Sequence, residues 1–185
     1  MSLRVISGSA RGRKLKSVPG DTTRPVMDRV KEALFNILAD DVIDSKWWDL
    51  FGGTGAIGIE ALSRGADFVR FSDLNRAPVE TIKENVAHCG FANQSEVRKG
   101  DAFSMLSAQV DRKFEYIYIA PPQYHEMWIK ALKLADENIG WLTDDGTVIV
   151  QIDPTEYQEI ELKKLEETEQ RKYGSTLIIF YDWLN

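Results

Sequence analysis

The sequence predicts an α/β fold, in which strands and helices alternate to build a mostly parallel sheet that finishes in an antiparallel pair. Short apolar segments typical of buried strands recur between residues 47 and 152, and segments with helical periodicity separate them. A glycine-rich loop follows the first of these strands and opens a helix. Two strand-like segments close the chain with no clear helix between them, which favours the antiparallel finish.

The composition is that of a water-soluble domain. Of 185 residues, 43% are hydrophobic and 28% are charged, which excludes wholesale disorder, and a single cysteine excludes a disulfide framework. No apolar run has the length of a membrane span or of a leader-peptide core. We therefore expect a cytoplasmic protein that has no membrane partner, needs no metal and acts as a monomer.

Charge is unevenly distributed along the chain. Residues 1–35 hold eight basic and three acidic side chains, a net charge of +5, while the rest of the chain carries −11 and the whole −6. We therefore divide the chain into a basic N-terminal arm or hairpin, residues 1–24, and a domain, residues 25–185. Arg11, Arg13 and Lys14 of the arm are candidates for gripping a polyanion, and a solvated terminal segment is the alternative.

The first helix follows the arm. Thr22 or Thr23 can cap it, and Pro25 suits its first turn. Apolar residues then follow the i, i+3, i+4, i+7, i+8 spacing of one helical face. We expect that face to be buried; it consists of Val30, Ala33, Leu34, Ile37 and Leu38.

Repeated strand and helix units come next. The patterns predict strands at 47–51, 68–72, 96–99, 114–119 and 147–152. Helices are expected between them, from the glycine loop through residue 62 and at 78–88, 101–108 and 124–137. The two closing strands are expected near 158–165 and 175–183.

The segment 49–58 is the most informative, because a strand, a glycine loop and a helix start follow one another there. Glycine at positions 52, 53 and 55 lets the backbone turn sharply and lets a ligand approach the main chain. Gly53, Gly55 and Gly58 also spell the G-x-G-x-x-G fingerprint of dinucleotide sites. The loop, which includes Gly52, therefore predicts a cofactor site.

Carboxylates follow three of the predicted strands. Asp73, 20 residues after Gly53, can take both hydroxyls of an adenosyl ribose, a group that NAD and S-adenosylmethionine share. Asp49 would repel a pyrophosphate, but it would attract the sulfonium and ammonium groups of S-adenosylmethionine. Asp101 is placed to accept from the adenine amino group. A strand-end cap and a helix cap are the alternatives for Asp49 and Asp101, yet the set favours S-adenosylmethionine.

The fourth strand ends in a stiff corner. Pro121 and Pro122 have no backbone N–H, so the carbonyls there are free to accept hydrogen bonds from an amino group. Such a corner, opposite a sulfonium methyl group, is what methylation of a base amino group requires, because orientation supplies much of the acceleration. Gln123 and Tyr124 complete the candidate catalytic segment.

Four stretches resemble the RsmD-type family of bacterial 16S ribosomal RNA (guanine-N2) methyltransferases: Arg4–Gly8, Arg11–Leu15, Thr23–Asn36 and Asp49–Ala66. The resemblance covers nearly the whole chain. It implies a Rossmann-like class I S-adenosylmethionine-dependent methyltransferase with seven strands, and small-subunit ribosomal RNA, or its assembling ribonucleoprotein particle, as partner. It also implies that Arg24, Asp28 and Phe35 help to close over the cofactor. The expected cofactor contacts are therefore Arg24, Asp28, Phe35, Asp49, Gly52, Gly53, Gly55, Asp73, Asp101 and Ala102.

The chain departs from the family pattern at the proline corner. Ala120 stands where the family has Asp or Asn, and Gln123 stands where it has an aromatic residue, with Tyr124 one step later. Losing a charged acceptor forfeits roughly 1.5–3 kcal/mol of hydrogen bonding. Gln123 offers a neutral carbonyl, and Tyr124 offers a ring that can stack on a flipped base. The alternatives are another nucleobase amino group, a catalytically silent RNA-binding or assembly module, and a nicotinamide-dependent oxidoreductase.

Overall fold

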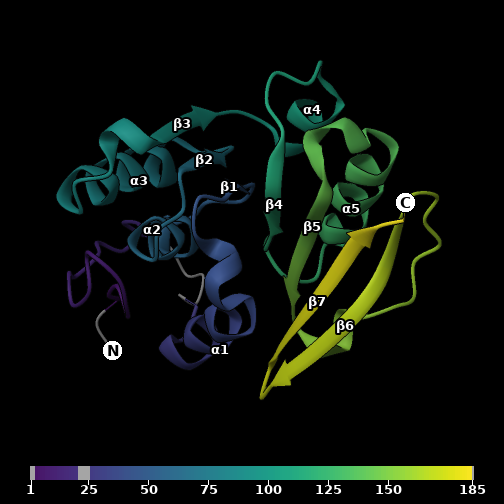
Figure 1. Cartoon of the computed structure of the whole chain (residues 1–185), viewed down its shortest axis with the longest axis horizontal. Helices are drawn as coiled ribbons and strands as arrows, with labels where there is room; N and C mark the ends of the chain where they lie inside the picture. Colours follow the sequence, from purple (N-terminus) through teal and green to yellow (C-terminus); the bar gives the residue numbers. More distant parts are fainter. Residues whose placement is uncertain (1–2, 21–25, 185) are drawn as a thin grey trace. The chain divides into compact units, whose positions relative to one another are not determined.

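The computed structural model describes residues 3–20 and 26–184, which fall into two units, Met1–Gly100 and Asp101–Asn185 (Figure 1). Arg24, the predicted caps Thr22 and Thr23, and Pro25 lie outside the described residues. The expected division of the chain after residue 24 stays a prediction.

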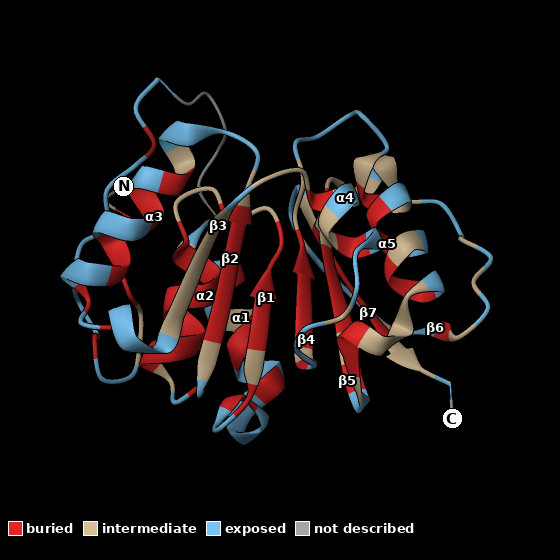
Figure 2. Cartoon of the chain, turned by 90° about the horizontal axis from the view of Figure 1, so that it is seen from above, coloured by how far each residue is buried: buried red, intermediate tan, exposed pale blue. Residues whose placement is uncertain are grey.

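Three parallel strands form the sheet of the first unit. β1 (Lys46–Asp49), β2 (Phe68–Asp73) and β3 (Ser95–Lys99) lie in the order β3-β2-β1. Between them run α2 (Ala56–Ser63), α3 (Arg76–His88) and the short η2 (Ala92–Gln94). β1 and β2 are almost entirely buried, as Figure 2 shows, because helices pack on a parallel sheet from both sides.

The first helix, α1 (Asp28–Leu38), is followed by η1 (Ala39–Val42). It begins three residues later than the predicted turn at Pro25. Val30, Leu34 and Leu38 are buried as predicted, but Ala33 is only partly buried and Ile37 is exposed. The buried face is rotated from the predicted one, because it includes two residues outside the predicted set, Lys31 and Phe35. Lysine carries a charge that an apolar pattern does not select.

Residues 3–15 form a short hairpin that is fixed to α2. The Val5 N–H donates to the Arg13 carbonyl at 3.0 Å, and the Leu15 N–H donates to the Leu3 carbonyl at 2.8 Å. The Ser9 N–H then donates to the carbonyl of Ser63, at the end of α2, at 2.7 Å. The basic arm is therefore packed onto the first unit along this edge.

Four strands form the sheet of the second unit, in the order β4-β5-β7-β6. β4 pairs with β5 in parallel, while β7 is antiparallel to both β5 and β6. The strands are β4 (Phe114–Ile119), β5 (Leu142–Ile152), β6 (Leu165–Tyr173) and β7 (Thr176–Trp183). The other elements are α4 (Ala102–Ser107), α5 (Met127–Glu137), η3 (Ile139–Trp141) and η4 (Pro154–Glu156).

The predicted fold is confirmed. The two units contribute three and four strands, parallel pairs predominate, and the last strand runs antiparallel to its neighbours. Within residues 3–20 and 26–184, no helix combines the length and apolarity that a membrane crossing requires.

One predicted strand was wrong. The segment 158–165 was expected to form the sixth strand, but β6 begins where that segment ends, at Leu165. The buried carboxylate of Asp136 in α5 accepts the N–H groups of Lys163, Lys164 and Leu165 at 2.8–2.9 Å. These bonds hold the connection against α5, so that pairing with β7 starts only at Leu165.

Gly8 is expected to be indispensable for docking the arm. It has φ +87°, and a Cβ atom there would lie 1.7 Å from the Ser63 carbonyl oxygen. Gly8→Ala should lower the free energy of unfolding in urea by about 2–4 kcal/mol. Gly12→Ala is the matched control: Gly12 has φ +83° but open space around it, so the loss should be about 1 kcal/mol. Equal losses would contradict the close approach as the cause.

Candidate functional site

Asp49 ends β1 and is buried, with 2% of its surface exposed. One of its carboxylate oxygens accepts the N–H of Gly58 in α2 at 3.3 Å. Burial raises the pKa of the Asp49 carboxyl to about 7; the Gly58 N–H opposes this rise and the nearby charge of Asp73 adds to it. At neutral pH this carboxyl is therefore poised between its charged and neutral forms, and a cation bound beside it would favour the charged form.

The glycine loop turns from β1 into α2 as the sequence predicts. Gly53 has φ +57°, and a Cβ atom placed there would meet nothing within 4 Å, so its backbone borders open space. Gly55 has φ +81° and is the N-cap residue of α2. At Gly52, by contrast, a Cβ atom would lie 2.7 Å from Ile82 Cδ1. Gly53 therefore leaves room for a ligand, while Gly52 allows close packing.

Gly58, the third glycine of the fingerprint, has a packing role. A Cβ atom there would lie 2.3 Å from the ring of Phe71 in β2. The residue therefore lets α2 approach the sheet, and its N–H bonds to Asp49 rather than pointing to a ligand.

Asp73 lies beside the loop at the end of β2, next to β1 in the sheet. Its Oδ2 accepts the Gly53 N–H at 3.1 Å, and its Oδ1 accepts the Asn75 N–H at 3.1 Å. Each oxygen keeps a second lone-pair direction for a hydroxyl donor. The structure thus places Asp49, the loop and Asp73 at one edge of the first unit's sheet.

Asn85 is a residue that the sequence reasoning missed. It is buried in α3, and its amide donates to the Thr54 carbonyl of the glycine loop at 2.9 Å and to the Lys16 carbonyl at 3.0 Å. Its side-chain oxygen accepts the Lys16 N–H at 2.8 Å. Asn85 therefore ties the loop to the arm. The signal in the sequence that could have identified Asn85 is its amide side chain on the face of α3 that also carries the apolar residues Ile82 and Val86.

Two of the three residues expected to close over the cofactor, Asp28 and Phe35, are described and have protein partners. Phe35 is 1% exposed; its ring stacks on Trp47 at 5.5 Å, and the Arg64 guanidinium lies over it at 5.1 Å. Asp28 pairs with Arg4 at 3.1 Å. Phe35 thus packs within the first unit, and direct contact of either residue with a ligand stays a prediction.

In the second unit, Asp101 is the N-cap of α4. Its Oδ2 accepts the Ser104 N–H at 2.8 Å and the Ser104 hydroxyl at 2.9 Å, so the helix-capping alternative describes its contacts. Ala102 follows as the first residue of α4 and is buried. Binding of adenine by either residue stays a prediction.

The proline corner follows β4 as an exposed loop. Pro121 is partly buried, whereas Pro122, Gln123 and Tyr124 are exposed. Tyr124 has φ +66°, and 68% of its surface is accessible. The exposed ring is available for stacking, and the backbone conformation is one that residues other than glycine rarely adopt.

The candidate RNA-binding side chains of the arm, Arg11, Arg13 and Lys14, are all exposed. Arg13 also donates to the carbonyl of His88 at the end of α3. Arg11 and Lys14 belong to the hairpin, in which the backbones of Lys14 and Arg4 form an isolated antiparallel β-bridge. All three are accessible to a polyanion.

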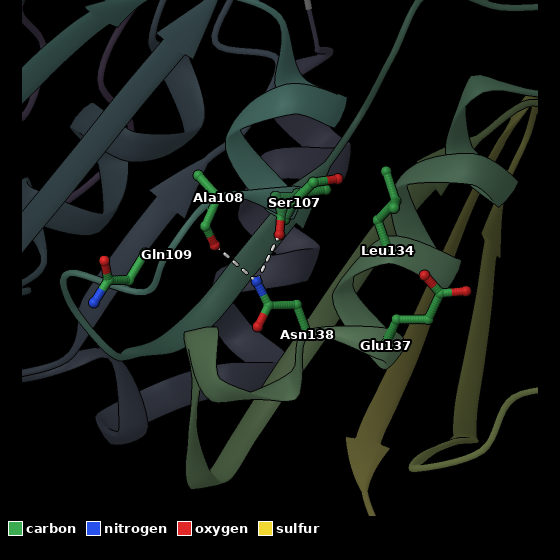
Figure 3. A pocket seen from close by; sticks show the side chains of 7 residues that line it. Ser107, Ala108, Gln109, Leu134, Glu137 and Asn138 are labelled. Atoms are coloured by element: carbon green, nitrogen blue, oxygen red, sulfur yellow. Dashed lines mark hydrogen bonds between the residues drawn. The ribbon is translucent and has the colours of Figure 1, made fainter.

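A depression of about 420 Å³ lies between the ends of α4 and α5 in the second unit (Figure 3). The Asn138 amide donates there to the carbonyls of Leu106 and Ala108 at 2.9 and 3.0 Å. None of the predicted site residues lines it, and these bonds fasten α4 to the end of α5.

Comparison with known proteins gives consistent matches. The family model described as "Conserved hypothetical protein 95" matches residues 3–182. The chain is 36% identical over 185 residues to "Putative rRNA methyltransferase YlbH" of Bacillus subtilis (strain 168), covering 97% of this chain and 98% of that protein. It is 35% identical over 149 residues to "Ribosomal RNA small subunit methyltransferase D" of Escherichia coli (strain K12), covering 80% of this chain and 74% of that protein.

A solved structure shows the same fold. The structure described as "Putative methyltransferase yhhF from Escherichia coli" superposes with a TM-score of 0.87 at 30% identity, covering 99% of this chain and 98% of that one.

The ionised side chain of Asp49 should lower the free energy of unfolding at neutral and alkaline pH. Between about pH 4 and 7 the folded protein binds a proton at Asp49 that the unfolded chain has released, so stability falls as the pH rises through this window. Asp49→Asn removes the titration and should stabilise the protein by about 2–4 kcal/mol at pH 8 and by much less at pH 4.

Urea unfolding across this pH range measures the effect. Asp41→Asn, at an exposed carboxyl of η1, is the matched control for the same chemical change at the surface. A constant difference between Asp49→Asn and the natural chain across pH 4–8 would refute the raised pKa.

Proposed function

Because the chain belongs to the family described as Conserved hypothetical protein 95, that of the RsmD-type ribosomal RNA methyltransferases, we propose that it methylates small-subunit ribosomal RNA. The methyl group passes from S-adenosyl-L-methionine to the exocyclic N2 amino group of a guanine. The observation that carries the proposal is the buried, titratable Asp49 beside an open glycine loop in the first unit.

The residues of the first unit fit this cofactor. S-adenosyl-L-methionine supplies an electrophilic methyl group on a positively charged sulfur. Asp49 provides a carboxylate whose ionisation a neighbouring positive charge favours, and Gly53 leaves its backbone accessible. Asp73 offers acceptor positions to the ribose hydroxyls. A dianionic pyrophosphate would instead raise the cost of ionising Asp49, which disfavours a nicotinamide dinucleotide.

The residues proposed to contact the adenine belong to the second unit. Asp101 accepts from the adenine amino group with the oxygen positions that Ser104 leaves free, and Ala102 contacts the adenine. Arg24, Asp28 and Phe35 are assigned to closure over the cofactor, as in the family that the chain belongs to.

The proline corner orients the guanine amino group. The backbone there accepts the amino hydrogens at carbonyls, because Pro121 and Pro122 have no N–H to compete for them. Gln123 adds a neutral carbonyl, and the exposed Tyr124 ring stacks on the base. Transfer converts the amino group to a methylamino group with loss of one proton, and little acid–base strength is needed because the sulfonium is a good leaving group.

Ala120 favours one alternative, a catalytically silent module that binds ribosomal RNA or an assembling particle without methylating it. The absent carboxylate would cost one to two decades in rate, roughly, if nothing replaced it. In either case we propose that the protein acts in the cytoplasm as a monomer.

Methyl transfer is tested directly. Purified protein with tritiated S-adenosyl-L-methionine should label small ribosomal subunits that lack the modification, and nucleoside digestion with mass spectrometry should identify N2-methylguanosine. Naked 16S ribosomal RNA serves as a second substrate and separates RNA from particle recognition.

A substrate that is already fully methylated is the control and should accept no label. Specific, salt-sensitive RNA binding without label at enzyme excess would establish the silent module. Label on another base atom would overturn the guanine-N2 assignment while leaving methyl transfer intact.

The arm should grip phosphates rather than read bases. Replacing Arg11, Arg13 and Lys14 together with Ala removes three exposed cations, so the slope of log affinity against log salt concentration should fall by roughly two to three. Cofactor affinity should stay unchanged. Lys83→Ala, at an exposed lysine of α3, is the single-charge control, and an unchanged slope in the triple variant would remove the arm from the RNA interface.

A further inference from the structure

We propose that the turn Asp153–Glu156, which follows β5, is a positioning element that holds Tyr124 in place for the RNA base. The proposal rests on the proposed function, since it assigns the positioned ring to base stacking. It adds two residues, Asp153 and Glu156, that no sequence motif indicated.

The sheet brings the turn and the loop together. β4 and β5 are parallel neighbours, with Ile119 paired to Val150, so both strands end at the same edge of the second unit. The segment 120–126 leaves β4 there, and η4 leaves β5 there. Ligands of open α/β sheets bind at this edge, where strand ends meet loops.

Glu156 makes the main contact. Its Oε1 accepts the backbone N–H of Tyr124 at 2.7 Å, across 32 positions in sequence. Its Oε2 accepts the Asp153 N–H at 3.4 Å, and the Asp153 carboxylate caps the same turn through the Thr155 N–H at 2.9 Å. The capping box thus fixes the orientation of the Glu156 carboxylate that accepts the Tyr124 N–H.

Asp153 reaches the same tyrosine through its side chain. The Asp153 carboxylate accepts the N–H and the hydroxyl of Thr155 at 2.9 and 2.6 Å. The Thr155 hydroxyl and N–H, with smaller contributions from Lys172 and Tyr124, lower the pKa of Asp153. Glu156 therefore holds the backbone of Tyr124, and the Asp153 side chain of the same turn interacts with Tyr124.

The loop needs such support. Tyr124 and Glu126 have φ +66° and +51°, a conformation that costs residues with side chains about 1 kcal/mol or more each. The Tyr124 ring, 68% exposed, has little packing of its own to fix it. The hydrogen bond from the Tyr124 N–H to Glu156 reduces the conformational freedom that the loop would otherwise lose on binding a base.

The turn is also relevant to Ala120, which stands where the family has Asp or Asn. Ala120 contributes no carboxylate to orient the substrate amino group, so the position of that amino group must depend more on how the base is stacked. A Tyr124 whose backbone is held places that base more reproducibly, and small misplacements of the base lower the rate steeply. Asp153 and Glu156 therefore act through Tyr124.

The first experiment needs no activity. Hydrogen exchange of the unbound protein should show faster exchange in the peptide covering residues 120–126 for Glu156→Ala than for the natural chain. Glu156→Gln keeps an acceptor for the Tyr124 N–H and should restore most of the protection. Glu161→Ala, at an exposed carboxylate of the same connection, is the matched control and should change nothing there.

The second experiment uses methyl transfer. Glu156→Ala should raise KM for the ribosomal substrate on the order of tenfold, while the affinity for S-adenosyl-L-methionine stays unchanged. Asp153→Asn should have a smaller effect of the same kind. In a Tyr124→Phe background, which lacks the phenol but keeps the ring, Asp153→Asn should have no further effect.

Three results would overturn the proposal. Unchanged exchange in Glu156→Ala would show that the turn does not hold the loop. An undiminished effect of Asp153→Asn in the Tyr124→Phe background would show that Asp153 acts other than through the phenol. An equal loss of cofactor affinity would indicate general unfolding.

Failure of the natural chain to methylate any ribosomal substrate would instead refute the proposed function. Hydrogen exchange together with RNA affinity would then decide the role of the turn.

Discussion

The carboxylate of Glu60 in α2, with no exposed surface, joins three segments of the first unit. Its oxygens accept the N–H groups of Ile6 and Ser7 in the arm at 2.9 and 3.0 Å. They also pair with Lys31 of α1 at 3.5 Å and with Arg64 at 2.9 Å. Burial lowers the pKa of Lys31, while the charge of Glu60 opposes that change. Removing either partner of this pair would therefore leave the other as a buried charge without its counter-charge. Because α2 begins at the glycine loop, the same contacts fix the candidate cofactor site.

Two buried carboxylates of this unit thus have opposite roles. Glu60 is surrounded by two cations and two backbone donors, and its burial is compensated. Asp49 accepts the Gly58 N–H at 3.3 Å and has a pKa of about 7, so its ionisation is poorly compensated in the protein alone. A residue that destabilises the fold when charged is expected where a positively charged ligand supplies the missing compensation. The first unit therefore combines a buried carboxylate whose charge is compensated, Glu60, with one whose charge the protein alone compensates poorly, Asp49.

In the second unit, two carboxylates, those of Asp136 and Glu156, bind backbone N–H groups. Asp136 gathers three consecutive N–H groups and sets where β6 begins, while Glu156 holds the N–H of Tyr124 in the loop after β4. Both act across more than 25 positions of sequence, and both fix segments that have little apolar surface to bury. Hydrogen bonds of this kind contribute more to geometry than to stability.

The sequence by itself determined the order of strands and helices, the glycine loop and the acids at the strand ends, because these depend on periodicity and on local backbone requirements. It also indicated the family. Only the tertiary structure decided the buried face of α1, since Lys31 is buried by Glu60 and Phe35 by Trp47, two partners distant in sequence. The start of β6 and the support of Tyr124 were decided in the same way. Polar side chains that bond distant backbone groups leave no periodic signal, whereas apolar burial and glycine conformations do.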